Sequence, residues 1–168
     1  MIKDSGDRTE FKGGAVRDIQ KGKGACWLLP LKEVSEFMAN DILRHIASYV
    51  ETYEDEYIFK ALAEFAHDNN WDVSTMILEL SKHFEEGANK YGINNWTKGI
   101  NAHCYIDSGI RHYLKWLRGD TDESHDRAFV WNMFCLLWTV HNMPEFNDLD
   151  KMAAVLPAPF VDKDEVIY

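Results

Sequence analysis

The sequence is poor in cysteine and in long apolar runs, and each absence excludes a class of protein. Three cysteines occur among the 168 residues, Cys26, Cys104 and Cys135, with no Cys-x-x-Cys pair. Widely spaced cysteines in odd number indicate neither a disulfide framework nor a cysteine-ligated zinc site, so we expect free thiols in a reducing cytoplasm. No signal peptide is evident, and no apolar run reaches the roughly 18 residues of a membrane-spanning helix, so we expect a soluble protein without membrane association.

Basic residues and nucleotide-loop motifs are also scarce. The chain has 18 Lys and Arg against 28 Asp and Glu, a net charge of −10. This charge argues against stable binding of nucleic acid, whereas a nucleotide needs only a local basic pocket and metal ions. Neither Gly-x-x-x-x-Gly-Lys-Ser/Thr nor Gly-x-Gly-x-x-Gly is present, which excludes the two common phosphate-binding loops.

Helical periodicity is present instead, with no convincing strand, and it predicts an all-α domain. Apolar residues recur at helical spacing over residues 31–53, 55–67, 73–91 and 102–118, and in the stretch 120–139, which Asn142 and Pro144 end. We therefore expect a bundle of about five helices over residues 31–143. An arm, residues 1–30, precedes this bundle, and a tail, residues 144–168, follows it as a loose wrap or a partner contact.

The arm carries four basic side chains within twelve residues, Lys12, Arg17, Lys21 and Lys23. Two interpretations stay open. The arm is either a flexible segment anchored on the core by residues 27–30, or a basic arm that folds over an anionic substrate.

The stretch 120–139 joins an acidic start to an apolar run. Its first seven residues hold four carboxylates and His125, and a helix that is apolar all round is a buried helix. Asn132 interrupts the apolar run, lies almost in line with His125 seven residues earlier, and must hydrogen-bond if buried. Asp122 and Asp126 flank this line. The stripe predicts a helix whose acidic start opens into a cleft; the alternative is that the acids complement the helix dipole and Asn132 is structural.

Two further helices carry candidate polar groups. Helix 73–91 has a core stripe of Ile77, Leu80, Phe84, Ala88 and Tyr91, with Glu85 beside it and Glu86 nearly opposite. In helix 102–118, Asp107, Arg111 and Lys115 are four residues apart, which fits either a salt-bridge row or a basic strip that meets phosphates. Between these helices, Asn95 and Trp96 belong to a loop that is a lid, a base-stacking surface or an anchor.

Two acidic clusters separated by a basic helix suggest a divalent-metal site for phosphates. In such a site the metal polarises a phosphate and activates water, and Lys and Arg neutralise the charge that develops on the transferred phosphate.

The motifs resemble a known family. The segments that carry the resemblance are Phe84-Glu-Glu-Gly-Ala-Asn-Lys-Tyr-Gly-Ile-Asn-Asn-Trp96, Asp107-Ser-Gly-Ile-Arg-His-Tyr113, residues 122–132, Gly14-Ala-Val-Arg-Asp18, Gly22-Lys-Gly24 and Leu28-Leu-Pro30. Taken together, in the order in which they occur along the chain, they resemble the phage and prophage dATP/dGTP diphosphohydrolases. That family is similar to the MazG-like all-α pyrophosphohydrolases. The resemblance implies a MazG-like helical bundle, a homo-oligomer, and the cytoplasm of a bacterial or phage-infected cell.

The same resemblance implies an activity and its residues. The expected reaction cleaves a purine deoxynucleoside triphosphate to its monophosphate and pyrophosphate with Mg²⁺ or Mn²⁺. The MazG-like pattern Glu-Glu-x-x-Glu and Glu-x-x-Asp places the metal on Glu85, Glu86, Glu123 and Asp126, although Asn89 stands where the third acid would be. The catalytic candidates are Glu85, Glu86, His125 and Asp126. The substrate-binding candidates are Lys90, Asn95, Trp96, Asp107, Arg111, Lys115 and Asn132.

Two rival hypotheses use the same residues differently. The adjacent pair His125-Asp126 is typical of HD-type metal phosphohydrolases, which would need an upstream histidine, His83 or His112, and a downstream acid such as Asp148. The other rival is an acidic interaction module without catalysis, in which the stripe along helix 120–139 is structural.

Overall fold

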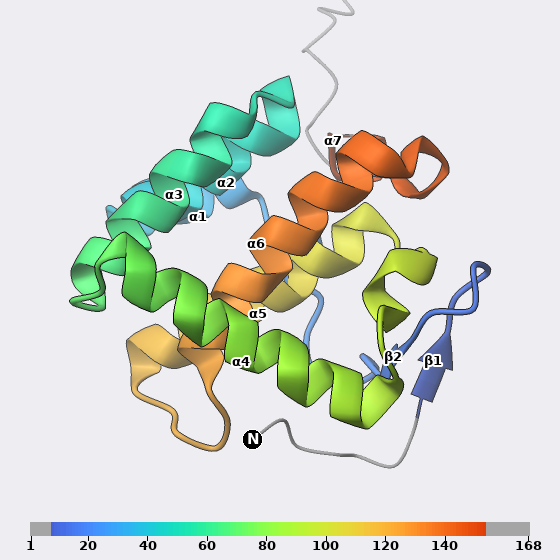
Figure 1. Cartoon of the computed structure of the whole chain (residues 1–168). Coiled ribbons are helices and arrows are strands. Elements are labelled where there is room, and N and C mark those ends of the chain that lie inside the picture. The colour runs from blue at the N-terminus through green and yellow to red at the C-terminus, as the bar shows by residue number, and fades with distance from the viewer. Residues whose placement is uncertain (1–7, 154–168) are drawn as a thin grey trace, which may run out of the picture.

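The computed structural model describes residues 8–153 as a bundle of helices (Figure 1). Within these residues the helices are α1 (Leu31–Met38), α2 (Asp41–Thr52), α3 (Asp55–Asp68), α4 (Val73–Tyr91), α5 (Ala102–Arg118), α6 (His125–Asn142) and α7 (Asp150–Ala153). The prediction of an all-α bundle is confirmed. One small element was not expected: β1 (Arg8–Glu10) and β2 (Val16–Asp18) pair as an antiparallel hairpin in the arm.

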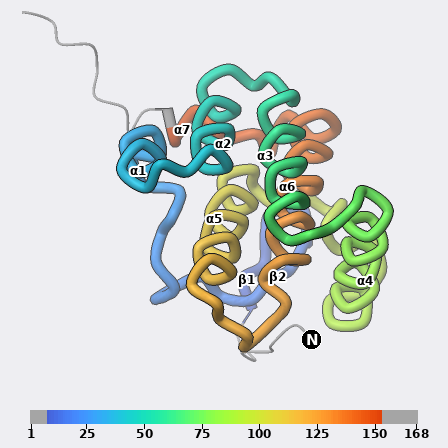
Figure 2. Tube along the Cα trace, turned by 90° about the vertical axis from the view of Figure 1, so that its left-hand side faces the viewer, coloured from blue at the N-terminus to red at the C-terminus, as the bar shows by residue number. Residues whose placement is uncertain are grey.

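Helix α6 is the centre of the bundle, as its apolar run predicts. It lies between α4 and α5 in both views (Figures 1 and 2) and also packs against α3. Gly109 of α5 permits close packing, because a Cβ at this position would lie 2.4 Å from the Met133 methyl carbon and 3.4 Å from the Asn132 Cβ. Two of the four polar residues of the predicted stripe, His125 and Asn132, are buried on this central helix.

Three of the five expected helices have the predicted bounds to within one residue, and two differ. The expected helix 31–53 is two helices, because Ala39 adopts a left-handed conformation at φ 49° and ends α1. Asn40 then caps α2 by accepting the Leu43 N–H at 2.9 Å, and its side-chain amide donates to the Tyr113 hydroxyl at 2.6 Å. The last large helix begins only at His125, so the acids before it lie in a turn.

The core face of α4 also differs from the prediction. Ile77 is 45 % exposed, and the buried residues are Met76, Leu80 and His83. Helix α4 is therefore rotated so that, of the predicted stripe, Leu80 is buried and Phe84, Ala88 and Tyr91 are only partly covered by the core.

The arm is fixed to the bundle through Asp18, at the end of β2. This carboxylate accepts hydrogen bonds from Arg8 at 2.7 Å, from Lys90 at 2.7 Å and from the Tyr91 hydroxyl at 3.0 Å. The side-chain amide of Asn95 accepts from the Val16 N–H at 2.9 Å and donates to the Val16 carbonyl at 2.8 Å. The hairpin therefore lies against the end of α4 and the loop after it.

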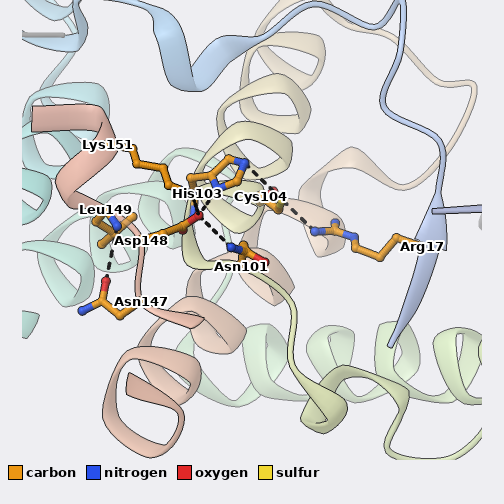
Figure 3. Close-up of polar contacts among 8 residues, drawn as sticks. All are labelled: Arg17, Asn101, His103, Cys104, Asn147, Asp148, Leu149 and Lys151. Atoms are coloured by element: carbon orange, nitrogen blue, oxygen red, sulfur yellow. Dashed lines mark hydrogen bonds and ion pairs between the residues drawn. The ribbon is translucent and has the colours of Figure 1, made fainter. Parts of the chain in front are cut away.

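The described part of the tail is anchored on the N-terminal end of α5. Asp148 accepts from the backbone N–H of His103 at 3.1 Å, from the Asn101 amide at 2.7 Å, and from the ring Nδ1 of His103 at 2.7 Å (Figure 3). Leu149 and Met152 are buried. Residues 144–153 are thus part of the bundle, and the rest of the predicted wrap, residues 154–168, is outside the described residues. No helix among the described residues has the length and apolar character to cross a membrane.

The His103–Asp148 pair makes stability depend on pH. Burial lowers the pKa of His103, but its hydrogen bonds to Asp148 and Cys104 outweigh burial and raise that pKa from 6.5 to about 9. Burial raises the pKa of the Asp148 carboxyl group, but the hydrogen bonds from His103 and Asn101 outweigh burial and hold this pKa well below the usual 3.8. A raised histidine pKa stabilises the fold below pH 6.5 and loses this effect as pH rises through 9. A lowered carboxyl pKa stabilises it above pH 3.8 and loses this effect on acidification.

Asp148→Asn is therefore expected to lower the free energy of unfolding by about 2 kcal/mol between roughly pH 4 and 6.5, where both charges are present. Urea unfolding of both proteins across this range and at pH 10 tests the effect, because the difference between them should shrink at the alkaline end. Asp68→Asn, at an exposed pair with His67, is the matched control. An equal difference at all pH values would contradict the ion pair as its source.

Candidate functional site

A cavity of about 670 Å³ lies where the hairpin meets the bundle. Its walls are β2 and the residues after it, the C-terminal half of α4, the loop 92–100, the middle of α5, and the turn and first part of α6. Ligand-binding pockets of proteins have volumes of roughly 300–1,000 Å³, so this cavity has the size for a nucleotide. Its lining combines basic, aromatic, acidic and histidine side chains.

Four basic side chains line the cavity: Arg17, Lys23, Arg111 and Lys115. The Arg17 guanidinium donates to the Asn132 side-chain oxygen at 3.2 Å and to the Cys104 carbonyl at 3.4 Å, and it lies over the rings of Tyr105 and Trp131. These contacts fix a partly buried cation at the base of the arm. The alternative that a basic arm folds over an anionic substrate fits this placement.

Arg111 and Lys115 are held by acids. Arg111 donates to Asp107, to the Gln20 side-chain oxygen at 2.9 Å and to the Gly24 carbonyl at 3.3 Å. Lys115 contacts Asp122 at 3.5 Å. Arg111 thus connects α5 to the arm, while Lys115 has one exposed partner and is the more available of the two cations.

An aromatic wall faces the cavity. Trp96 packs between Phe84 and Trp138, with ring centroids 5.4 and 4.8 Å away, and Phe84 packs on Trp131 at 6.1 Å. Phe84, Trp96 and Trp131 all line the cavity. Because Trp96 is held from α4 and α6 at once, its ring is a fixed surface.

A chain of two histidines and a carboxylate lies at the polar end of the cavity: His112 and Asp122 line it, and the buried His125, which connects them, does not. The His125 Nε2–H donates to Asp122 Oδ1 at 2.8 Å, and the Nδ1 atoms of His125 and His112 are 2.9 Å apart. Burial, followed by the neighbouring His125, His83, Arg17 and Arg111, lowers the pKa of His112 well below 6.5, so His112 is neutral. The hydrogen bond from His125 holds the pKa of Asp122 below its usual range.

This end of the cavity contains groups that fit a metal ion. Ligand atoms of His112, Glu123 and His125 lie within 4.8 Å of one another, and so do those of Asp120, Asp122 and His125. Two imidazoles and a carboxylate are ordinary ligands of divalent transition metals. His125 is common to both groups.

The four carboxylates that the resemblance assigns to the metal are not brought together. Glu85 and Glu123 line the cavity, on α4 and on the turn before α6. Glu86 instead lies 3.4 Å from Arg127, and Asp126 accepts the backbone N–H of that same residue at 2.8 Å. Within residues 8–153, no group of three ligand atoms within 4.8 Å includes Glu85, Glu86 or Asp126. Neighbours on a helix point about 100° apart, so only one of the Glu85-Glu86 pair faces the cavity.

The predicted substrate-binding residues divide into two sets. Asn95, Trp96, Arg111, Lys115 and Asn132 line the cavity. Lys90 and Asp107 do not: Lys90 is paired with Asp18 at the hairpin, and Asp107 accepts from Arg111 and, at 3.3 Å, from the Trp27 N–H. The side-chain oxygen and the side-chain nitrogen of Asn95 both bond to the backbone of Val16. Lys90, Asp107 and Asn95 therefore hold the walls of the cavity in place.

Five residues outside the main sequence prediction also line the cavity: Arg17, Lys23, His83, His112 and Asp122. The sequence indicates them only through the alternatives of a basic arm and an HD-type site and through the acidic stripe. His83 is 9 % exposed, packs on Trp131 with centroids 5.6 Å apart, and has a buried Nδ1 without a hydrogen-bond partner. Burial, with the charges of Arg127 and Arg17, lowers its pKa to about 3, so His83 is neutral. The signal that could have found His112 is its position beside Arg111, on the helix that faces the acidic turn.

The set needed by an HD-type site is only partly present. His112 and His125 touch, but Asp148 binds His103 at the N-terminal end of α5, nine residues before His112 along the helix. At 1.5 Å per residue this separation is about 13 Å. The Asp126 carboxylate caps the next residue and does not face His112.

Comparison with known proteins identifies the central part of the chain. Residues 72–149 match the model of a family described as dATP/dGTP diphosphohydrolase, N-terminal. No curated protein and no solved structure matches the chain. The matched residues contain α4, α5, α6 and the turn with Asp122 and Glu123, and thus most of the cavity wall, whereas Arg17 and Lys23 precede them. The name of that family describes dATP/dGTP diphosphohydrolases, and residues 72–149, slightly less than half of this chain, are similar to it.

Proposed function

We propose that this protein hydrolyses dATP or dGTP to the monophosphate and pyrophosphate with the help of a divalent cation. The observation that carries the proposal is the composition of one cavity, which joins four cations, a fixed aromatic wall and a histidine–carboxylate cluster. Each of these corresponds to one part of a nucleotide reaction: binding the phosphates, binding the base and activating water.

The basic side chains bind the triphosphate. Arg17 and Arg111 have guanidinium groups fixed by other contacts, which suits them to a defined phosphate oxygen. Lys23 and Lys115 are more exposed and neutralise charge on the outer phosphates. Positive groups that are already positioned stabilise the charge that develops on the transferred phosphoryl group without reorganising during the reaction.

The aromatic wall receives the purine. Stacking of a base on an aromatic side chain contributes about 1–3 kcal/mol. Trp96 offers a ring that Phe84 and Trp138 hold in place. His83, neutral and with an unpartnered Nδ1, supplies one hydrogen bond to an edge of the base.

The metal fits His112, Glu123 and His125 better than the four carboxylates expected from the resemblance. Mg²⁺ prefers oxygen ligands, whereas imidazole nitrogens suit transition metals, so of Mg²⁺ and Mn²⁺ this donor set favours Mn²⁺. When bound, the cation lowers the pKa of water and neutralises phosphate charge. Glu85, the α4 carboxylate on the cavity wall, accepts a proton from the attacking water. The oxygen of that water bonds to the α-phosphorus, and pyrophosphate leaves.

The products test the reaction. With Mn²⁺, dATP or dGTP is expected to give the deoxynucleoside monophosphate and pyrophosphate in equal amounts, measured by anion-exchange chromatography. A panel of ribonucleotides and pyrimidine nucleotides run in parallel gives the selectivity. Release of intact triphosphate or of inorganic phosphate would instead support the HD-type alternative. No turnover with either metal, and no rise of the melting temperature with nucleotide and Mn²⁺, would support the interaction module.

Substitution of His112 separates the two ligand sets. His112→Asn is expected to reduce kcat with Mn²⁺ by about a hundredfold and to abolish the rise in melting temperature that Mn²⁺ alone produces. Glu123→Gln should act similarly. Glu79→Gln, on α4 and away from the cavity, is the control. Retained activation in His112→Asn together with loss in Glu86→Gln would favour the four-carboxylate arrangement.

Two lysines of the arm form a matched pair for the phosphate contacts. Lys23 lines the cavity, and Lys21, two residues earlier, is exposed and does not. Lys23→Ala is expected to raise KM for dATP or dGTP about five- to tenfold, because a charge-assisted phosphate contact at a partly exposed site contributes about 1 kcal/mol or slightly more. Lys21→Ala should leave KM unchanged. Equal effects of the two substitutions in steady-state kinetics would show that only the overall charge of the arm matters.

A further inference from the structure

Outside the cavity, three side chains form a linear chain that ends on a thiol. Asp148 Oδ2 lies 2.7 Å from Nδ1 of His103, and Nε2 of the same ring lies 3.4 Å from Sγ of Cys104 (Figure 3). A carboxylate only accepts hydrogen bonds, so Nδ1 carries a proton and donates it to Asp148. The opposite nitrogen then faces the sulfur.

The His103 ring is fixed in this orientation. Asp148 is itself held by the Asn101 amide at 2.7 Å and by Lys151 at 3.1 Å. Trp27 packs on the ring from the arm, with centroids 4.9 Å apart. An acid, an imidazole and a thiol are therefore aligned by contacts from the arm, from α5 and from the tail.

The groups next to Cys104 are positive. The raised pKa of His103, about 9, makes this ring an imidazolium at neutral pH. Cys104 is the third residue of α5, where the positive end of the helix dipole lies, and Arg17 donates to its carbonyl. A positive partner and a helix N-terminus are the two features that stabilise cysteine thiolates. Asp148 and Lys151 are the other charged groups in these contacts.

The other two cysteines differ from Cys104. Cys135 is completely buried, and burial raises the pKa of its thiol. Cys26 is half-buried like Cys104, but burial raises its pKa as well. Within the described residues, only Cys104 of the three hydrogen-bonds to a histidine.

We propose that Cys104 is a reactive thiol and a site of covalent modification by small electrophiles, with hydroperoxides as the physiological class. The Cys104 sulfur attacks one peroxide oxygen, the O–O bond breaks, and the leaving oxygen takes the His103 proton and departs as water or an alcohol. Cys104 is oxidised to the sulfenic acid, the peroxide is reduced, and His103 becomes neutral. Asp148 is a positioning residue that keeps the imidazolium directed at the sulfur.

Competitive labelling of the three cysteines tests the proposal. With limiting iodoacetamide on the folded protein at pH 7, peptide mass spectrometry should show Cys104 alkylated about tenfold faster than Cys26. His103→Asn should reduce the Cys104 rate to that of Cys26, and Asp148→Asn should reduce it several-fold. His67→Asn, at an exposed histidine, is the control, and melting curves check the fold. Equal rates in the native protein, or an unchanged rate in His103→Asn, would overturn the assignment.

Two readouts depend on the chemistry and not on accessibility alone. The ultraviolet absorbance of a thiolate at pH 7 should disappear in Cys104→Ser and in His103→Asn. Hydrogen peroxide followed by dimedone should label Cys104, and the absence of this label would exclude the hydroperoxide step. Cys104→Ser keeps the carbonyl that Arg17 binds, so nucleotide hydrolysis should be unchanged, and this result separates failure of the thiol proposal from failure of the proposed function.

Discussion

The hydrogen bond from Arg17 to Asn132 is the interaction on which the cavity depends. Asn132 is 1 % exposed on the central helix, and its amide donates to the Ala128 carbonyl at 2.7 Å, so its side-chain oxygen is free to accept from the arm. The guanidinium also reaches the Cys104 carbonyl and two aromatic rings, and thereby joins β2, α5 and α6. An apolar residue at position 132 would leave this partly buried guanidinium with one hydrogen-bond partner fewer, which costs about 1–3 kcal/mol. Asn132, the polar residue that interrupts the apolar helix, is thus a residue to which the arm binds.

The charges of the cavity are balanced before any ligand binds. The protein has a net charge of −10, yet four cations line one cavity, and carboxylates hold two of them: Asp107 beside Arg111, and Asp122 beside Lys115. A negative protein repels a nucleotide at long range, but at physiological salt this repulsion is screened beyond about 8 Å. Capture of the nucleotide therefore depends on short-range contacts. A phosphate that approaches Lys115 competes with Asp122, and a divalent cation near Glu123 reduces the repulsion between this acidic turn and the phosphate.

The sequence predicts the helices better than their contacts. The periodicity of α3, α4 and α5 predicts their bounds to within one residue, because each has its own apolar spacing and a local end signal. The break at Ala39 is missed, since apolar spacing continues across it from Met38 to Ile42. The hairpin is missed because its partners are distant: Val16 binds Asn95, 79 residues away. The metal ligands depend on helix rotation: the resemblance places Glu86 at the metal, whereas periodicity places it nearly opposite the core stripe, and in the structure it lies 3.4 Å from Arg127.

Helix α5 serves two kinds of chemistry, and the structure indicates how they stay separate. His103 and Cys104 lie in its first turn, and His112 lies nine residues after His103, about 13 Å along the axis. Arg17 is the side chain that contacts both regions, because it lines the cavity and binds at Cys104. Its partner there is the backbone carbonyl and not the sulfur. Oxygen added to the sulfur leaves that carbonyl in its helical hydrogen-bonding position, so a change in the charge of the thiol reaches the nucleotide site only as a screened Coulomb effect. A side-chain substitution at Cys104 keeps the carbonyl that Arg17 binds, so its energetic effect is expected to add to that of a substitution at the nucleotide site.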